Sequence, residues 1–271
     1  RNNGHEYVPQ AVAPSAAVPV VDDRYVIGSR SGPVILTEHM KVDVHELIRD
    51  RNICVVTVRD TRKALSALSA AFFDHPAERM KMIGITGTNG KTTTTTLLGE
   101  IMKAYQDDVF VVGNIGNPYT VAADLMTEHS IAVAEMSSFQ LESIVSFRPN
   151  VSAILNYTPD HLNRHHTMEA YIAAKENIAR NQTEDDYCVL NYEEPVMRKF
   201  AETLKCHVLF FSSQHKLEKG IYLDNDKIIY KNPDEVEVCH VDELQILGTH
   251  NYENVMAAIC MAAVYGVPME T

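Results

Sequence analysis

The sequence predicts an α/β fold in which a central domain with a mostly parallel sheet follows a small, truncated α/β domain. From residue 80 onward, short and nearly continuous apolar runs alternate with helical stretches, as in a parallel sheet covered on both faces. A glycine-rich turn joins the first of these runs to a helix. The 271 residues suffice for one large and one smaller domain. We therefore expect domains at residues 1–79 and 80–271.

The first domain shows weaker patterns than the second. An apolar, alanine-rich stretch spans residues 10–21, and a short apolar run spans residues 52–58. Residues 63–73 place apolar side chains at helical spacing and predict a helix. The pair His75-Pro76 should end that helix and start a linker, because the residue before a proline disfavours helical geometry.

The central domain contains eight predicted strands and three predicted helices. The turn Asp224-Asn225-Asp226 should join the last two strands as a hairpin. Gly266 suits the end of the last helix. We expect strands at residues 81–86, 109–112, 131–135, 151–156, 187–190, 207–211, 221–223 and 227–230, and helices at residues 91–105, 168–180 and 251–265.

Composition excludes several classes of protein. A 45% hydrophobic and 22% charged chain is ordinary for a soluble globular protein. The net charge of −12, with no basic cluster, argues against a nucleic-acid partner. No apolar run reaches the roughly 18 residues that span a membrane, and no signal peptide is visible, so we expect no membrane partner. Five scattered cysteines fit a reducing compartment, and we expect a cytoplasmic protein.

The glycine-rich turn has the pattern of a phosphate-binding loop. It reads GITGTNGKT over residues 84–92 and lies between a predicted strand and a predicted helix, which indicates a sheet of the P-loop type. The backbone amides from Gly87 to Lys91, which include Thr88, Asn89 and Gly90, can surround phosphates at the helix N-terminus. Lys91 supplies a positive charge, and Thr92 offers a hydroxyl to Mg²⁺.

One position of this loop departs from the general pattern. Ile85 stands where the pattern GxxxxGK[ST] has its first glycine. An ordinary strand–turn–helix with a chance Gly-Lys pair is the alternative. It is disfavoured because two glycines, a lysine and a threonine all fall in the required context.

Two polar residues follow apolar strands of the same predicted sheet. Glu135 ends one strand and His161 comes soon after another. Ligands of doubly wound sheets bind at the carboxyl ends of the strands, so these side chains could hold Mg²⁺ beside the phosphates. A solvated strand-end acid and a structural loop histidine are the alternatives, and imidazole is unusual for Mg²⁺. From its spacing alone, Lys175 reads as a surface lysine.

Six segments, in this order, resemble the central domain of the Mur ligases, and more narrowly their D-glutamate-adding members. They are TGTNGKT at residues 86–92, GNIGNP at 113–118, EMSSFQLE at 135–142, NYTPDHLNRH at 156–165, YIAAKENI at 171–178 and GTHNYENVMAA at 248–258. The resemblance covers the chain from about Met80 to its end.

The resemblance implies an ATP-dependent amide-bond ligase of peptidoglycan precursor synthesis. ATP would phosphorylate the carboxylate of UDP-N-acetylmuramoyl-L-alanine. The amino group of D-glutamate would then displace phosphate from the acyl phosphate. The implied cofactors are ATP and Mg²⁺, and the implied partners are a UDP-N-acetylmuramoyl substrate and an amino acid.

The resemblance also implies roles for individual residues. Lys91, His161 and Lys175 would be catalytic, and Lys175 matches a lysine that the family carbamylates. Asn163 departs from the family, which commonly has aspartate there. The implied metal ligands are Thr92, Glu135, His161 and carbamylated Lys175; the implied substrate contacts are Asn114 and Ser137; and His250, Asn251 and Asn254 would lie near the nucleotide.

The first domain carries a different resemblance. Residues 3–11 and 58–66 are similar to the UDP-binding domain of Mur ligases that add a diamino acid or lysine to the UDP-muramoyl-dipeptide. The chain would then be a hybrid, and the third domain of the family would be missing after Thr271. Addition of a diamino acid or lysine, and a catalytically incomplete nucleotide-binding fragment, are therefore alternatives to D-glutamate addition. Folylpolyglutamate synthetases share the fold, but GNIGNP and SSFQLE fit them less well.

Overall fold

The computed structural model describes residues 20–22, 56–58, 61–72 and 75–271. The chain divides into two compact units, Arg1–Phe72 and Phe73–Thr271. The boundary between residues 79 and 80 stays a prediction, and it falls at the end of the short helix α4 (Pro76–Arg79).

The first unit contains a parallel strand pair and a helix. Strand β1 (Val20–Asp22) pairs with β2 (Val56–Val58), and helix α3 (Thr61–Phe72) follows. The predicted helix is confirmed, with its start two residues earlier. The rest of the predicted apolar stretches lies outside the described residues. So does most of the segment that resembles the diamino-acid-adding ligases, and that resemblance stays a prediction.

The second unit is built on a nine-stranded sheet of order β11-β10-β9-β8-β7-β6-β3-β5-β4. Strands β3 to β9 all run parallel to one another, and the pairs β9–β10 and β10–β11 are antiparallel. Their bounds are β3 Lys81–Thr86, β4 Val109–Gly113, β5 Ile131–Glu135, β6 Val151–Ile154, β7 Tyr187–Asn191, β8 His207–Ser212, β9 Gly220–Asp224, β10 Lys227–Lys231 and β11 Glu235–His240.

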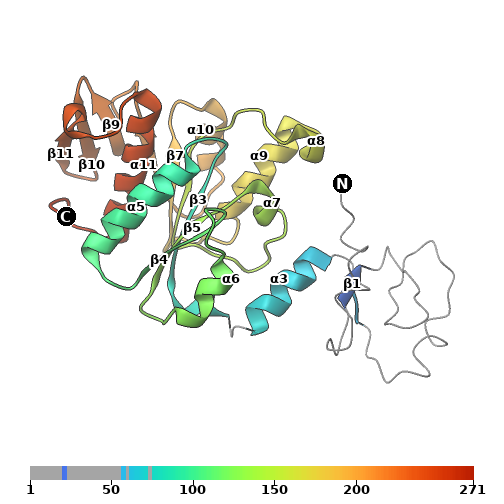
Figure 1. Ribbon diagram of the computed structural model, residues 1–271. Helices are drawn as coiled ribbons and strands as arrows, with labels where there is room; N and C mark the ends of the chain where they lie inside the picture. Colours follow the sequence, from blue (N-terminus) through green and yellow to red (C-terminus); the bar gives the residue numbers. More distant parts are fainter. Residues whose placement is uncertain (1–19, 23–55, 59–60, 73–74) are drawn as a thin grey trace, which may run out of the picture. The chain divides into compact units, whose positions relative to one another are not determined.

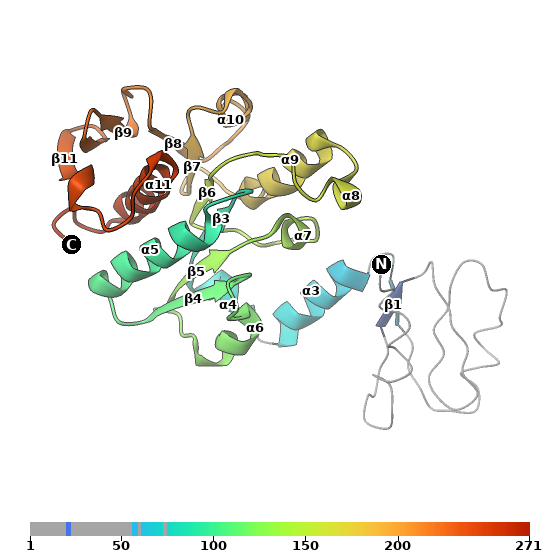
Figure 2. The ribbon, with the colours of Figure 1, turned by 45° about the horizontal axis from the view of Figure 1, so that its top comes forward.

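Helices cover both faces of this sheet. On one face, α5 (Lys91–Tyr105) and α11 (Thr249–Tyr265) lie side by side over a core that includes Ile83, Ile85 and Met256 (Figure 1). The other face carries α7 Ser138–Leu141, α9 Met168–Glu176, the 3₁₀ turn η3 Asn177–Ala179 and α10 Pro195–Ala201 (Figure 2). The remaining short helices are α6 Tyr119–Ala122, η2 Ala123–Leu125, α8 Leu162–His165 and η4 Val241–Glu243.

The predicted strands and long helices are confirmed, with differences at their ends. Strand β6 ends at Ile154, because residues 155–158 turn to meet the phosphate loop. The helix predicted at residues 168–180 ends at Glu176 and continues as the turn η3. Pro76 begins α4 instead of a linker, since proline is favoured in the first turn of a helix. The patterns did not predict α10 or β11.

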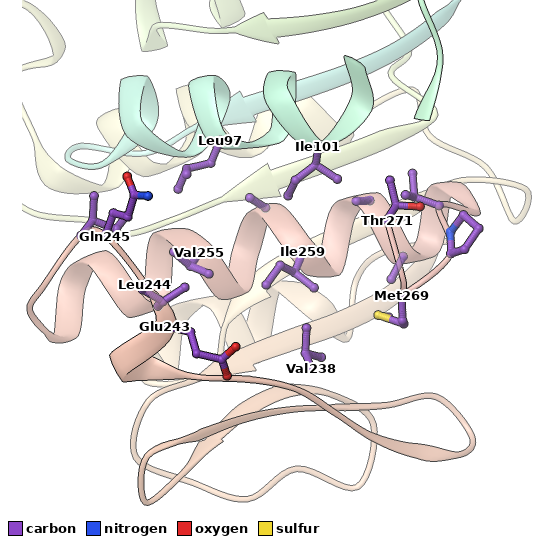
Figure 3. Close-up of a pocket in the computed structure, with 16 residues that line it drawn as sticks. Leu97, Ile101, Val238, Glu243, Leu244, Gln245, Val255, Ile259, Met269 and Thr271 are labelled. Atoms are coloured by element: carbon purple, nitrogen blue, oxygen red, sulfur yellow. The ribbon is translucent and has the colours of Figure 1, made fainter. Parts of the chain in front are cut away.

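An apolar pocket of about 510 Å³ lies between α5, α11 and the segment that follows β11 (Figure 3). Aliphatic side chains such as Leu97, Ile101 and Ile259 line it. None of the predicted site residues, all of which the structure describes, lies in its wall. Its apolar character does not suit a charged nucleotide, so the candidate site is elsewhere. Within the described residues, no helix combines the length and apolar character needed to cross a membrane.

Candidate functional site

The loop between β3 and α5 has the geometry of a phosphate-binding loop. Gly87 and Gly90 adopt φ angles of 154° and 79°, which L side chains rarely adopt. A Cβ on Gly90 would lie 2.1 Å from Oδ1 of Asn254, so a larger residue there would have to displace the Asn254 side chain as well as adopt an unfavourable φ angle. Helix α5 begins directly after Gly90, and its free N-terminal amides lie at the loop.

Residues that follow β6 hold this loop in place. Asn156 Oδ1 accepts from the backbone N–H groups of Thr88 and Asn89 at 3.1 and 2.9 Å. Its Nδ2 donates to Asn89 O at 3.1 Å. The Thr88 hydroxyl lies 3.0 Å from both Thr158 O and the Tyr171 hydroxyl. No sequence pattern distinguished Asn156, Thr158 and Tyr171, although the place of the polar Asn156 at a predicted strand end was an available signal.

Two lysines converge on the same carbonyl of the loop. Lys91 Nζ donates to Gly87 O at 3.0 Å and to Thr88 O at 2.8 Å. Lys175 Nζ donates to Gly87 O at 2.6 Å and lies 4.6 Å from the centre of the Tyr171 ring. The positive charge gathered here suits a polyphosphate. The expectation of a surface lysine at 175 was wrong, because only 2% of this residue is exposed.

Burial changes the acid–base behaviour of both amines. Desolvation lowers the pKa of Lys91 from its ordinary value, although Glu135 and Asp160 act against the shift. For Lys175, burial and then the charge of Lys91 lower the pKa to about 7. Near neutral pH, a large share of Lys175 is therefore an uncharged, nucleophilic amine.

This shift predicts a pH dependence of stability. The unfolded chain keeps a proton on Lys175 up to about pH 10.4, whereas the folded chain releases it near pH 7. Unfolding therefore takes up a proton between these values. The free energy of unfolding should rise with pH across this window by up to about 1.4 kcal/mol per pH unit. Lys175→Met should remove this part of the slope in urea unfolding at about pH 7 and about pH 9.

The control for that measurement is Lys103→Met, which changes an exposed lysine of α5. It should leave the slope as it is in the unchanged protein. An equal slope in Lys175→Met and the unchanged protein would contradict the lowered pKa.

Glu135 lies at the end of β5, where two other predicted residues meet it. Its Oε2 accepts from the Thr92 hydroxyl at 2.9 Å, and its Oε1 accepts from Asn114 Nδ2 at 3.1 Å. Only 2% of Glu135 is exposed. A Cβ on Gly113, at the end of the neighbouring strand, would lie 2.2 Å from Glu135 O, so glycine is needed for this close approach.

The donor chemistry of this pair fits Mg²⁺. One carboxylate and one hydroxyl supply oxygen ligands, and Mg²⁺ commonly completes its shell with phosphate oxygens and water. In the described part of the chain, no three His, Cys, Asp or Glu side chains form a metal cluster of their own. Thr92 and Glu135 would therefore hold Mg²⁺ together with a bound polyphosphate.

His161 makes other contacts. Its Nε2 lies 3.3 Å from Asp160 Oδ2, and its ring centre lies 4.9 Å from that of Phe139. Among the contacts of the described residues, none joins His161 to Glu135 or Thr92. The metal-binding role of His161 stays a prediction.

Ser137 and the N-terminal end of α11 complete the set of predicted residues. Ser137 caps α7, and its hydroxyl donates to Gln140 Oε1 at 2.9 Å. Asn254 Oδ1 accepts from the Thr94 hydroxyl at 3.2 Å, and Asn254 Nδ2 donates to Asn251 Oδ1 at 3.4 Å. His250 is exposed beside them. Their contacts with substrate or nucleotide stay predictions.

Comparison with known proteins assigns the family. The family described as the Mur ligase middle domain matches residues 85–262, more than half of the chain. The UDP-N-acetylmuramoylalanine–D-glutamate ligase of Lachnoclostridium phytofermentans is 59% identical over 191 residues, which cover 70% of this chain and 42% of that protein. The enzyme of the same name from Clostridioides difficile is 52% identical over 188 residues, which cover 69% of this chain and 42% of that protein.

Solved structures share the fold at lower identity. A UDP-N-acetylmuramoyl-L-alanyl-D-glutamate–2,6-diaminopimelate ligase aligns with a TM-score of 0.64 and 22% identity, over 79% of this chain and 50% of that one. The MurF ligase of Thermotoga maritima in complex with ADP aligns with a TM-score of 0.56 and 19% identity, over 98% of this chain and 58% of that one. The chain spans less than half the length of the two curated relatives. Because this family matches residues 85–262, the chain belongs to the Mur ligases.

Proposed function

We propose that residues 80–271 form the nucleotide-binding core of an ATP-dependent ligase that adds D-glutamate to UDP-N-acetylmuramoyl-L-alanine through an acyl phosphate. The main support for this proposal is the way three features of the site come together. The phosphate loop, the paired amines of Lys91 and Lys175, and the Thr92–Glu135 pair converge at the carboxyl ends of neighbouring parallel strands. The names and identities of the two curated relatives support D-glutamate as the amino acid.

In this proposal, the chain binds and orients the phosphates of ATP. The loop amides and the N-terminus of α5 would contact the phosphate oxygens, and Lys91 would exchange its carbonyl partners for them. Thr92 and Glu135 would hold Mg²⁺. When bound, Mg²⁺ supplies positive charge that offsets the negative charge of a moving phosphoryl group. Asn114, bonded to Glu135, would link this position to the muramoyl substrate.

Lys175 has a separate place in the proposal. An amine with a pKa of about 7 is available as a nucleophile near neutral pH, unlike an exposed lysine. Its nitrogen can attack CO₂, form a C–N bond and release a proton, which leaves a carbamate. The carbamate would place a carboxylate beside the phosphate loop and make Lys175 a further metal ligand.

Phosphate release in two parallel reactions tests the proposed function. One contains ATP, UDP-N-acetylmuramoyl-L-alanine and D-glutamate, and the other contains ATP, the UDP-muramoyl-dipeptide and a diamino acid. We expect release in the first reaction only, and we expect Lys175→Ala to abolish it even with added bicarbonate. Release only in the second would favour addition to the dipeptide. If neither reaction releases phosphate while the chain still binds ATP, the chain is a catalytically incomplete nucleotide-binding core.

A further inference from the structure

A second polar cluster, which no sequence pattern predicted, lies at the carboxyl ends of β7 and β8. Its centre is Glu253, near the N-terminal end of α11. Glu253 Oε1 accepts from the Ser213 hydroxyl at 2.6 Å, and Oε2 accepts from Asn191 Nδ2 at 3.4 Å. The same Asn191 amide donates to Leu155 O at 3.1 Å. One carboxylate thus connects a helix with the ends of the sheet.

A second carboxylate fixes the loop that carries Ser213. Glu193 Oε1 accepts from the Ser212 hydroxyl at 2.5 Å and from Gln214 N at 3.2 Å. Glu193 Oε2 lies 3.0 Å from Nδ1 of His215. Ser213 is therefore held between two residues anchored to Glu193, and it offers Glu253 a fixed donor.

The residue after Glu253 touches the phosphate loop. Asn254 lies so close to Gly90 that the loop has no room for a Cβ there, and it also accepts from Thr94 on α5. Glu253 and Asn254 are adjacent on α11, so any shift of this end of the helix moves both. A displacement of this end would move Asn254 away from Gly90.

We propose that Glu253 is a positioning residue for nucleotide binding. Its carboxylate ties the N-terminal end of α11 to the ends of β7 and β8 and thereby sets Asn254 against the phosphate loop. This inference rests on the proposed function, because it takes the loop as the nucleotide site. None of the polar contacts of Glu253 involves a residue of the loop itself.

Whether removal of the Glu253 carboxylate weakens or strengthens ATP binding distinguishes a positioning role from a purely electrostatic one. Glu253 and ATP are both negative, so electrostatics alone predicts that removal of the carboxylate strengthens nucleotide binding. A positioning role predicts instead that removal of the carboxylate weakens nucleotide binding. Glu253→Gln separates the two further, because it removes the charge and keeps an oxygen that can accept from Ser213.

The test is calorimetric titration of the full chain with ATP and Mg²⁺. Glu253→Ala should bind about tenfold more weakly, which corresponds to about 1.4 kcal/mol, and Glu253→Gln should stay within about threefold of the unchanged protein. Ser213→Ala should also weaken binding, and adding Glu253→Ala to it should cost less than Glu253→Ala alone. Glu100→Ala, on the exposed side of α5, is the matched control and should change nothing.

Two outcomes would overturn the positioning role alone. The first is that Glu253→Ala folds, as shown by a circular dichroism spectrum like that of the unchanged protein, and binds ATP as tightly or more tightly. The second is that Glu253→Ala and Glu253→Gln weaken ATP binding equally. If Glu253→Ala does not fold, the test rests on Ser213→Ala. Unchanged ATP binding by Ser213→Ala would then overturn the positioning role. Failure of the unchanged protein to bind ATP would overturn the proposed function and this inference together.

Discussion

Replacement of Lys91 by alanine should weaken the binding of ATP with Mg²⁺ by roughly 30- to 160-fold. A hydrogen bond to a charged group contributes about 2–3 kcal/mol when it is desolvated, and each 1.4 kcal/mol is tenfold in affinity. The Lys91 amine lies within the loop, where it bonds Gly87 O and Thr88 O and can turn to phosphate oxygens. Calorimetric titration of both proteins with ATP measures the effect directly.

Lys103→Ala is the matched control for this prediction. Lys103 belongs to the same helix, but it is half-exposed and pairs with Glu100 at 2.7 Å. Its removal subtracts the same charge without changing the loop, so the affinity should stay within about twofold of the unchanged value, because exposed charges are screened by salt. Equal losses in the two variants would mean that Lys91 acts only through the net charge of the chain.

Glu135→Gln should remove most of the Mg²⁺ dependence of ATP binding. Outer partners of metal ligands already contribute 10- to 100-fold to metal affinity, so loss of a carboxylate ligand should cost roughly 100-fold or more. The amide keeps nearly the same shape between Thr92 and Asn114, so the fold should tolerate it. The quantity to measure is the ratio of ATP affinities with Mg²⁺ and with a chelator.

In the unchanged protein this ratio should be large, and in Glu135→Gln it should approach one. Glu128→Gln changes an exposed glutamate elsewhere on the same unit and serves as the control. A ratio that stays large in Glu135→Gln would place the metal on other residues, and His161 would be the next candidate to change.

The phosphate loop and the strand ends could be predicted from the sequence because their signals are local. Glycines, a lysine and a threonine occupy consecutive positions between a strand and a helix, and parallel strands bring their carboxyl ends to one edge. This reasoning brought Thr92 and Glu135 together correctly. It could not reveal that Asn114 reaches the same carboxylate, which the resemblance to the family supplied only as a substrate contact.

The contacts that sequence patterns missed join distant parts of the chain. Asn156 bonds the loop from 68 positions away, and Lys175 reaches Gly87 O from 88 positions away. The position of Lys175 on a helix with small neighbours does not tell which element packs over it. Its amine lies against Gly87 O and the Tyr171 ring. Glu253 is a further case, since its partners come from the ends of two strands.

A crystal structure of the full chain with Mg²⁺ and a non-hydrolysable ATP analogue would show whether this loop is the nucleotide site. We expect the phosphates between residues 87–91 and the N-terminus of α5, with the Lys91 amine on a phosphate oxygen and Mg²⁺ on Thr92 and Glu135. A nucleotide bound away from this loop, or a metal held by residues that do not include Glu135, would contradict this expectation.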